Sequence, residues 1–124
     1  MRMQQRQLGA IRVVEVEGTV IQEHAETLRA AMTKLLDLGH RQIVLDLGEL
    51  KDFDSAAVGT LMATQIRAGK VGAVLKIANA GKRLRDLLAV TRLSPMFESY
   101  DSLDAAIASF AAEIQGNGKT EPQS

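Results

Sequence analysis

The side chains best suited to chemistry lie in one short segment, residues 52–55, which reads Asp-Phe-Asp-Ser. An apolar stretch, residues 42–47, precedes this segment, and apolar residues with helical spacing follow it. The segment therefore connects a predicted strand to a predicted helix. Asp54 is of a residue type preferred at a helix N-cap, so we expect Ser55 in the first turn with its hydroxyl exposed. Because a helix N-terminus carries partial positive charge, a hydroxyl there is a suitable acceptor for a phosphoryl group.

Two interpretations of Asp54 and Ser55 follow from these residue types. In the first, the pair only starts a helix, as Asp and Ser do in proteins of every kind. In the second, Ser55 is a phosphorylation switch. A phosphate would add a charge of about −1.5 to −2 beside Asp52 and Asp54, and it would change the electrostatic field of any interface at that point. The residue types alone leave both interpretations open.

Other kinds of active site find little support in the sequence. Cysteine is absent, which excludes thiolate catalysis, disulfides and cysteine-ligated metals. His24 and His40 are not paired with carboxylates at metal-ligand spacing, and no Gly-x-Ser-x-Gly motif surrounds Ser55. We therefore expect no catalytic residue, no metal site and no cofactor.

A basic cluster, Lys82, Arg83 and Arg85, follows Gly81. The Gly-Lys pair lacks the earlier glycine and the following Ser or Thr of a phosphate-binding loop. We interpret the cluster as a solvated basic face. The alternative is contact with an acidic partner or with a nucleotide phosphate.

The composition limits the classes of partner. Among the 124 residues, Lys plus Arg equals Asp plus Glu at 15 each, and aromatic residues make up only 3%. Such a balanced surface has no general attraction for nucleic acid and few rings on which bases can stack. No apolar run approaches the roughly 20 residues that span a bilayer, and the polar residues 1–7 do not form the apolar segment of a signal peptide. We expect a cytoplasmic protein without a membrane span.

Alternating strand and helix patterns predict an α/β fold. Strands are expected at 11–17, 19–21, 42–47, 73–77 and 96–100, and helices at 24–38, 55–68, 81–90 and 102–113. They should form a mixed sheet of four or five strands, with parallel, adjacent central strands at 43–47 and 73–77, covered by about four helices. The expected domain is 1–114, followed by a flexible polar tail at 115–124. The predicted core residues are Leu28, Leu35, Val44, Leu45, Leu61, Val74, Ile77, Leu88, Ile107 and Phe110.

The order of elements and one motif resemble the STAS domains of bacterial anti-sigma factor antagonists. The motif is Leu-Asp-Leu at 45–47, followed by Asp54, Ser55, Ala56 and Gly59. Such domains place the sequence Asp-Ser-(Ser/Thr/Ala)-Gly-Leu-Gly between a buried strand and a helix. The resemblance covers roughly residues 10–112.

This resemblance implies a partner-switching function without catalytic activity. The serine that matches Ser55 is phosphorylated by an anti-sigma factor that is also a serine kinase. The unmodified antagonist binds that kinase, phosphorylation breaks the complex, and a phosphatase of the PP2C type restores it. The implied docking surface is Asp52, Phe53, Asp54, Ser55, Gly59 and the exposed part of the following helix. An alternative for Phe53 is a side chain that points into the core.

Two positions depart from the family pattern. Ala57 stands where a glycine is usual, and Ile21 stands where an Asp near the phosphorylated serine is common. These departures favour an alternative function, a constitutive STAS subunit of a larger complex, such as a stress-signalling scaffold or a lipid-transport assembly.

Overall fold

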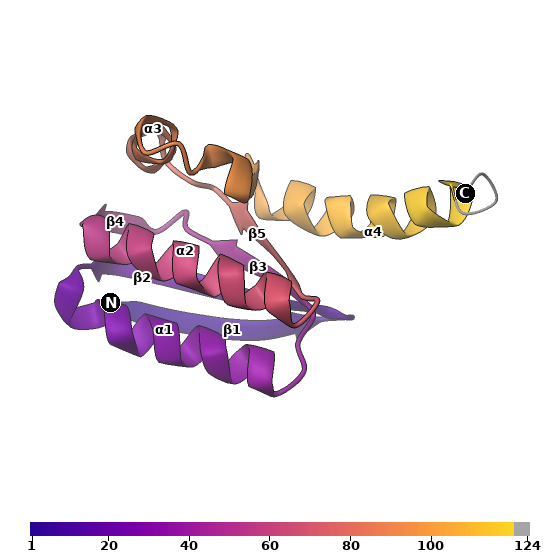
Figure 1. Ribbon diagram of the computed structural model, residues 1–124, viewed down its shortest axis with the longest axis horizontal. Helices are drawn as coiled ribbons and strands as arrows, with labels where there is room; N and C mark the ends of the chain where they lie inside the picture. The colour runs from indigo at the N-terminus through magenta and orange to yellow at the C-terminus, as the bar shows by residue number, and fades with distance from the viewer. Residues whose placement is uncertain (121–124) are drawn as a thin grey trace.

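The centre of the molecule is a six-stranded sheet in the order β1-β2-β3-β5-β6, with β4 paired to the far end of β2 (Figure 1). The computed structural model describes the backbone of residues 1–120 and the side chains of residues 1–113. The strands are β1 (Arg2–Leu8), β2 (Ile11–Val20), β3 (Gln42–Asp46), β4 (Leu50–Phe53), β5 (Val74–Ala78) and β6 (Glu98–Tyr100). The helices are α1 (Gln22–Asp37), α2 (Ser55–Lys70), α3 (Lys82–Val90), the 3₁₀ turn η1 (Ser94–Met96) and α4 (Leu103–Thr120).

The central strands run as the sequence predicts. The pairs β2–β3, β3–β5 and β5–β6 are parallel, and β1 pairs with β2 in the antiparallel direction. β3 and β5 are adjacent, with Val44 opposite Lys76 and Leu45 opposite Ile77. Helices cover both faces of these strands, which explains why β3 is almost continuously apolar. The predicted α/β fold with a parallel core is confirmed.

The strand count was too low because β1 and β4 were not predicted. β1 is an edge strand whose seven residues are exposed except for half-buried Met3, so it carries no apolar alternation. The predicted strands at 11–17 and 19–21 form one strand, β2. Gly18 adopts a φ of +83°, which favours glycine, at an irregularity where β2 stops following β3 and begins to pair with β4.

Two hydrophobic cores lie on opposite faces of the sheet. The larger core joins β2, β3 and β5 to α1, α2 and α3 through residues such as Val16, Leu28, Leu61 and Leu84. The smaller core lies under α4, which Figure 1 shows on the side of β5 away from α1 and α2. Its buried residues are Ile11, Val13, Val44, Ala78, Ala106 and Phe110.

Most predicted core residues are buried, with one error. Val74 is 38% exposed. It is the first residue of β5 and lies on the same face as Lys76, so it falls at the rim of the smaller core. Ile107 is half-buried.

Two predicted boundaries near the C-terminus also differ from the structure. The predicted strand at 96–100 is shorter, since Ser94–Met96 form η1 and the strand begins at Glu98. The last helix begins at Leu103 and continues to Thr120, beyond its predicted end at residue 113. Residues 121–124 of the predicted tail lie outside the described part of the chain. Within residues 1–120, no helix has both the length and the apolar character needed to cross a membrane.

The smaller core contains a charged residue, Lys76, whose side chain is 0% exposed. Its Nζ donates to Ser109 Oγ at 2.8 Å and to Glu113 Oε1 at 2.5 Å. The same Nζ lies 4.2 Å from the centroid of the Phe110 ring. All three of these partners belong to α4, so Lys76 links that helix to β5.

Candidate functional site

The segment singled out in the sequence lies where β4 meets α2. β4 runs parallel to the end of β2, and the Asp54 amide donates to the Val20 carbonyl at 3.3 Å. α2 begins at the next residue, Ser55, which is exposed as predicted. The hydroxyl of Ser55 therefore lies at the first position of a 16-residue helix that packs on the larger core.

Asp54 is the N-cap of α2 and also supports the start of α1. Its Oδ1 accepts from the amides of Ala56 at 2.9 Å and Ala57 at 3.4 Å. Its Oδ2 accepts from the amide of Gln22, the first residue of α1, at 3.0 Å. The N-termini of the two helices thus converge on one carboxylate, where their partial positive charges favour an anion.

The N-terminus of α1 explains how Ile21 is tolerated. Ile21 occupies the N-cap position but has no side-chain acceptor. Its own amide donates to His24 Nδ1 at 3.2 Å, which requires an unprotonated Nδ1, and Asp54 accepts from the amide of Gln22. The carboxylate of Asp54, the N-cap of α2, therefore supplies an acceptor that residue 21 lacks.

Asp52 is held by an arginine from α3. Arg83 Nη2 donates to Asp52 Oδ1 at 2.6 Å and to the Phe53 carbonyl at 3.0 Å. The Asp52 pKa is lowered below its usual value, chiefly by the hydrogen bond from Arg83 and then by the backbone amide of Phe53. The end of β4 therefore forms an exposed ion pair with α3 rather than a free acidic loop.

Phe53 lies between the interior and the surface. It is half-buried and packs against the larger core, beside a small apolar cavity whose lining includes Leu50 and Leu84. The guanidinium carbon of Arg83 lies 4.4 Å from the centroid of the Phe53 ring, a cation–π distance. The ring therefore packs against the core, as one of the two interpretations predicts, and Arg83 lies over it.

Gly59 lies one helical turn after Ser55 and is exposed. A Cβ built at this position meets no atom within 4 Å, so nothing within the described chain requires a glycine. A glycine inside an exposed helix costs about 1 kcal/mol relative to alanine. The helix therefore carries at this position a destabilising residue that packing does not explain.

The sequence does not predict the contacts of Arg83 with this segment. Arg83 was interpreted, with Lys82 and Arg85, as part of a solvated basic face. Arg83 is indeed mostly exposed, but it binds residues 30 and 31 positions earlier in the chain. No local pattern marks such a contact, because it depends on where α3 packs against the sheet.

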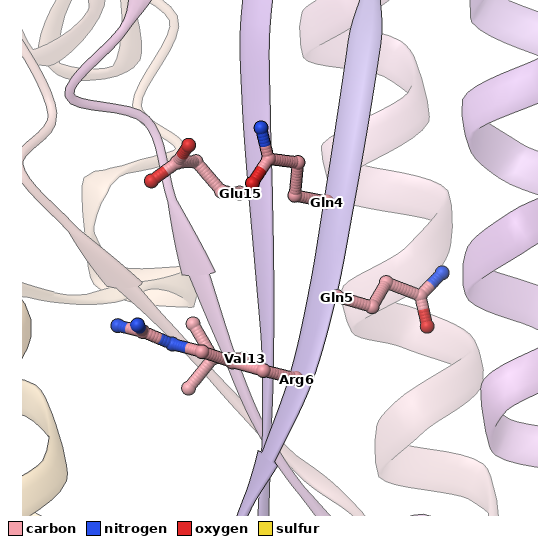
Figure 2. Close-up of a pocket in the computed structure, with 5 residues that line it drawn as sticks. All are labelled: Gln4, Gln5, Arg6, Val13 and Glu15. Atoms are coloured by element: carbon pink, nitrogen blue, oxygen red, sulfur yellow. The ribbon is translucent and has the colours of Figure 1, made fainter.

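A second hollow lies away from this site, on the β1–β2 pair. Figure 2 shows Gln4, Arg6 and Glu15 on one side of these strands and Gln5 on the other. The alternation of side chains along a strand explains this division. The hollow shares no residue with the site around Ser55.

Comparison with known proteins agrees with this fold. A family model described as "Mlab, STAS domain" matches residues 3–98. A Bordetella bronchiseptica protein named "Putative anti-sigma factor antagonist BtrV" is 24% identical over 114 residues, which cover 92% of this chain and 98% of that protein.

Solved structures of similar proteins share the fold. An anti-sigma factor antagonist from Mycobacterium paratuberculosis superposes with a TM-score of 0.79 at 23% identity, covering 87% of this chain and 92% of that one. The phosphorylated form of the Bacillus cell fate determinant SpoIIAA gives a TM-score of 0.71 at 18% identity, covering 88% and 99%. Because the family model matches well over half of the residues, the chain belongs to the STAS domain family.

Proposed function

We propose that this protein is an anti-sigma factor antagonist that binds an anti-sigma factor with serine kinase activity and is released when that kinase phosphorylates Ser55. The observation that carries the proposal is the position of Ser55, exposed at the first residue of α2 directly after a carboxylate that already caps the helix. The relatives described as anti-sigma factor antagonists support the same function.

The fold is arranged to tolerate a phosphate on Ser55. Asp54 supplies the acceptor for the first amides of α2, so the helix does not need the Ser55 hydroxyl as its cap. A phosphate at a helix N-terminus also interacts favourably with the helix dipole. Phosphorylation should therefore act on a bound partner and leave the fold intact.

The proposed docking surface runs from the end of β4 along the outer face of α2. Ser55, Gly59, Met62 and Ile66 follow one another at helical spacing and line one face. Ile66 is 46% exposed, and Met62 is half-buried. These residues form a surface that is mainly apolar or small, with the hydroxyl of Ser55 near its end and half-buried Phe53 two residues earlier in the chain.

A phosphate on that surface would oppose binding for two reasons. It carries a charge of about −1.5 to −2, which must be desolvated if the interface closes over it. It also adds negative charge beside the carboxylates of Asp52 and Asp54. A loss of about 3 kcal/mol of interface energy weakens binding roughly 150-fold, enough to release the partner. A PP2C-type phosphatase would then restore the binding form by hydrolysing the phosphate.

Titration of variants against the partner kinase tests this function. Ser55→Asp should fold normally but bind the anti-sigma factor far more weakly, as should wild-type protein treated with the kinase. Ser55→Ala should bind like unmodified wild type and stay bound when ATP is added. Ser102→Asp is the control, because Ser102 also lies at the start of a helix, where its Oγ accepts from the Ala105 amide, but that helix is α4.

One set of results would exclude the switch. If the kinase labels no residue at position 55 and Ser55→Asp binds as tightly as wild type, Ser55 only starts a helix. The constitutive STAS subunit of a larger complex would then be the better description of the protein.

A further inference from the structure

Arg83 is in place to respond to the modification state of Ser55. In the unmodified protein it contacts the end of β4 in three ways: with the Asp52 carboxylate, with the Phe53 carbonyl and with the Phe53 ring. Phe53 is only two residues from Ser55, so their Cα atoms are within about 7 Å of each other. A long arginine side chain that reaches the carbonyl of Phe53 therefore lies near the position of a phosphate on Ser55.

Two of the backbone amides at the start of α2 are already engaged and are not free to receive that phosphate. The amides of Ala56 and Ala57 already donate to Asp54 Oδ1. A phosphate that took these donors would displace the cap of α2 and break the link to Gln22 through the other oxygen of Asp54. A side-chain cation is the less costly partner.

The lysines of β4 and α3, Lys51 and Lys82, pair with acidic residues close to them in the sequence rather than with the β4–α2 junction. Lys51 Nζ lies 3.6 Å from Glu49, and Lys82 Nζ lies 2.6 Å from Asp86. The guanidinium of Arg83, in contrast, is already directed at the β4–α2 junction. Its planar group of donors also matches phosphate oxygens better than a lysine ammonium does.

We propose that Arg83 is the phosphate-sensing residue of this site: when Ser55 is phosphorylated, the Arg83 guanidinium exchanges the Asp52 carboxylate for the phosphate. This proposal rests on the proposed function, since it assigns the group that reads the modification. The exchange is favoured because a phosphate carries up to twice the charge of Asp52, and the phosphate also repels the Asp52 carboxylate. It would release the Asp52 carboxylate from Arg83, so that phosphorylation changes the contacts at the end of the docking surface as well as its charge.

The test uses full-length protein that carries phosphoserine at position 55, introduced during translation so that no kinase is needed. The second pKa of the phosphate is measured by phosphorus NMR in wild type, Arg83→Gln and Arg85→Gln. A cation that binds the dianion favours the charged form, so this pKa should be at least about half a pH unit lower in wild type than in Arg83→Gln. Arg85→Gln removes a neighbouring positive charge of the same helix and should behave like wild type.

Two further comparisons make the result decisive. Arg83→Lys keeps the charge but loses the planar donor group, so it should give an intermediate phosphate pKa. If the Arg83→Gln protein does not give a native amide spectrum, Arg83→Lys replaces it as the test variant. Equal phosphate pKa values in wild type and the Arg83 variants would overturn the proposal. It would also be overturned if the phosphate pKa rises as much in Arg85→Gln as in Arg83→Gln, because the total positive charge of α3 would then explain the effect.

The outcomes separate this inference from the proposed function. If the phosphate pKa depends on Arg83 but the cognate kinase does not label Ser55, the sensing geometry exists and the switch does not. If the kinase labels Ser55 and releases the partner while the phosphate pKa is independent of Arg83, the switch works without this residue.

Discussion

Asp54 uses its two carboxylate oxygens for two different helices. Oδ1 accepts from the first amides of α2, and Oδ2 accepts from the first amide of α1. The apolar Ile21 is acceptable at the start of α1 because that acceptor comes from elsewhere in the chain. Asp54 directly precedes Ser55, so these hydrogen bonds also help to set the position of the proposed phosphoacceptor.

Replacing Asp54 should therefore destabilise the protein more than the loss of a single helix cap. Asp54→Ala leaves amides of both helices without their acceptor and should lower the free energy of unfolding by about 1–3 kcal/mol. Asp54→Asn keeps one side-chain carbonyl oxygen and should cost clearly less. Urea denaturation of both variants measures this. Equal stability of Asp54→Ala and wild type would show that the shared cap contributes nothing.

Asp52 gives the site a dependence on pH in the acid range. The hydrogen bond from Arg83 lowers the Asp52 pKa below its usual value of about 3.8. A carboxyl whose pKa is lowered by folding stabilises the protein above its usual pKa, and the stabilisation is lost as the pH falls through the lowered value. In Arg83→Gln, carboxyl NMR should therefore show the Asp52 pKa closer to 3.8, with Arg85→Gln unchanged. An identical Asp52 titration in all three proteins would contradict this account.

At the scale of the elements, the helices and strands that bury an apolar face could be predicted from the sequence, and the strands β1 and β4, which do not, could not. In α1, Leu28 and Leu35 lie two helical turns apart and face the larger core, and Leu61 of α2 faces the same core. This apolar spacing allowed both helices to be predicted. β1 is an exposed edge strand of mostly polar residues, and the four residues of β4 are held by pairing with β2, so neither carries an apolar pattern. Pairing partners of this kind are set by the assembled sheet rather than by local sequence.

The candidate site likewise has features that the sequence predicts and features that it does not. The cap by Asp54 and the exposure of Ser55 follow from local helix chemistry and were predicted. The contacts of Arg83 with Asp52 and Phe53, and of Asp54 with Gln22, join residues 30 to 32 positions apart. They depend on how α1 and α3 pack, which no short motif records.

Helix α2 offers a matched pair of glycines for testing the docking surface. Gly59 and Gly69 are both exposed, and a Cβ at either position meets no atom within 4 Å. Alanine at either position should stabilise the helix by up to about 1 kcal/mol. Only Gly59→Ala should weaken binding to the anti-sigma factor, because only Gly59 lies one turn from Ser55. Calorimetric titration of both variants measures this, and equal affinities would remove Gly59 from the docking surface.

At the scale of the whole molecule, the two cores are unequal. The larger core joins three helices to the sheet, whereas the smaller core is formed mainly with α4 and includes a buried lysine. The contacts of Lys76 with Ser109 and Glu113 compensate its charge, but the burial of a charge carries a large desolvation penalty. Because this penalty offsets the ionic contacts, we expect the packing volume of the Lys76 side chain to contribute to the attachment of α4 at least as much as its charge does.

Substitutions of Lys76 separate these two contributions. Lys76→Met keeps most of the packing volume and removes the desolvation penalty, so its free energy of unfolding should stay within about 1 kcal/mol of wild type. Lys76→Ala leaves a cavity under Phe110 and should cost about 2–4 kcal/mol. Chemical denaturation measures both. If Lys76→Met is as unstable as Lys76→Ala, the ionic contacts hold α4 in place and this account is wrong.

The contact between Asp54 and Gln22 also has a consequence for the order in which the chain is made. These residues are 32 positions apart, and α1 is complete before any of β4 exists. At about 5–20 residues per second, the ribosome adds Asp54 roughly 2–6 s after Gln22. During that interval the nascent α1 lacks the acceptor for its first amide. The first amide of α1 can therefore reach its final hydrogen bond only after Asp54, the residue directly before the proposed phosphoacceptor, has been added to the chain.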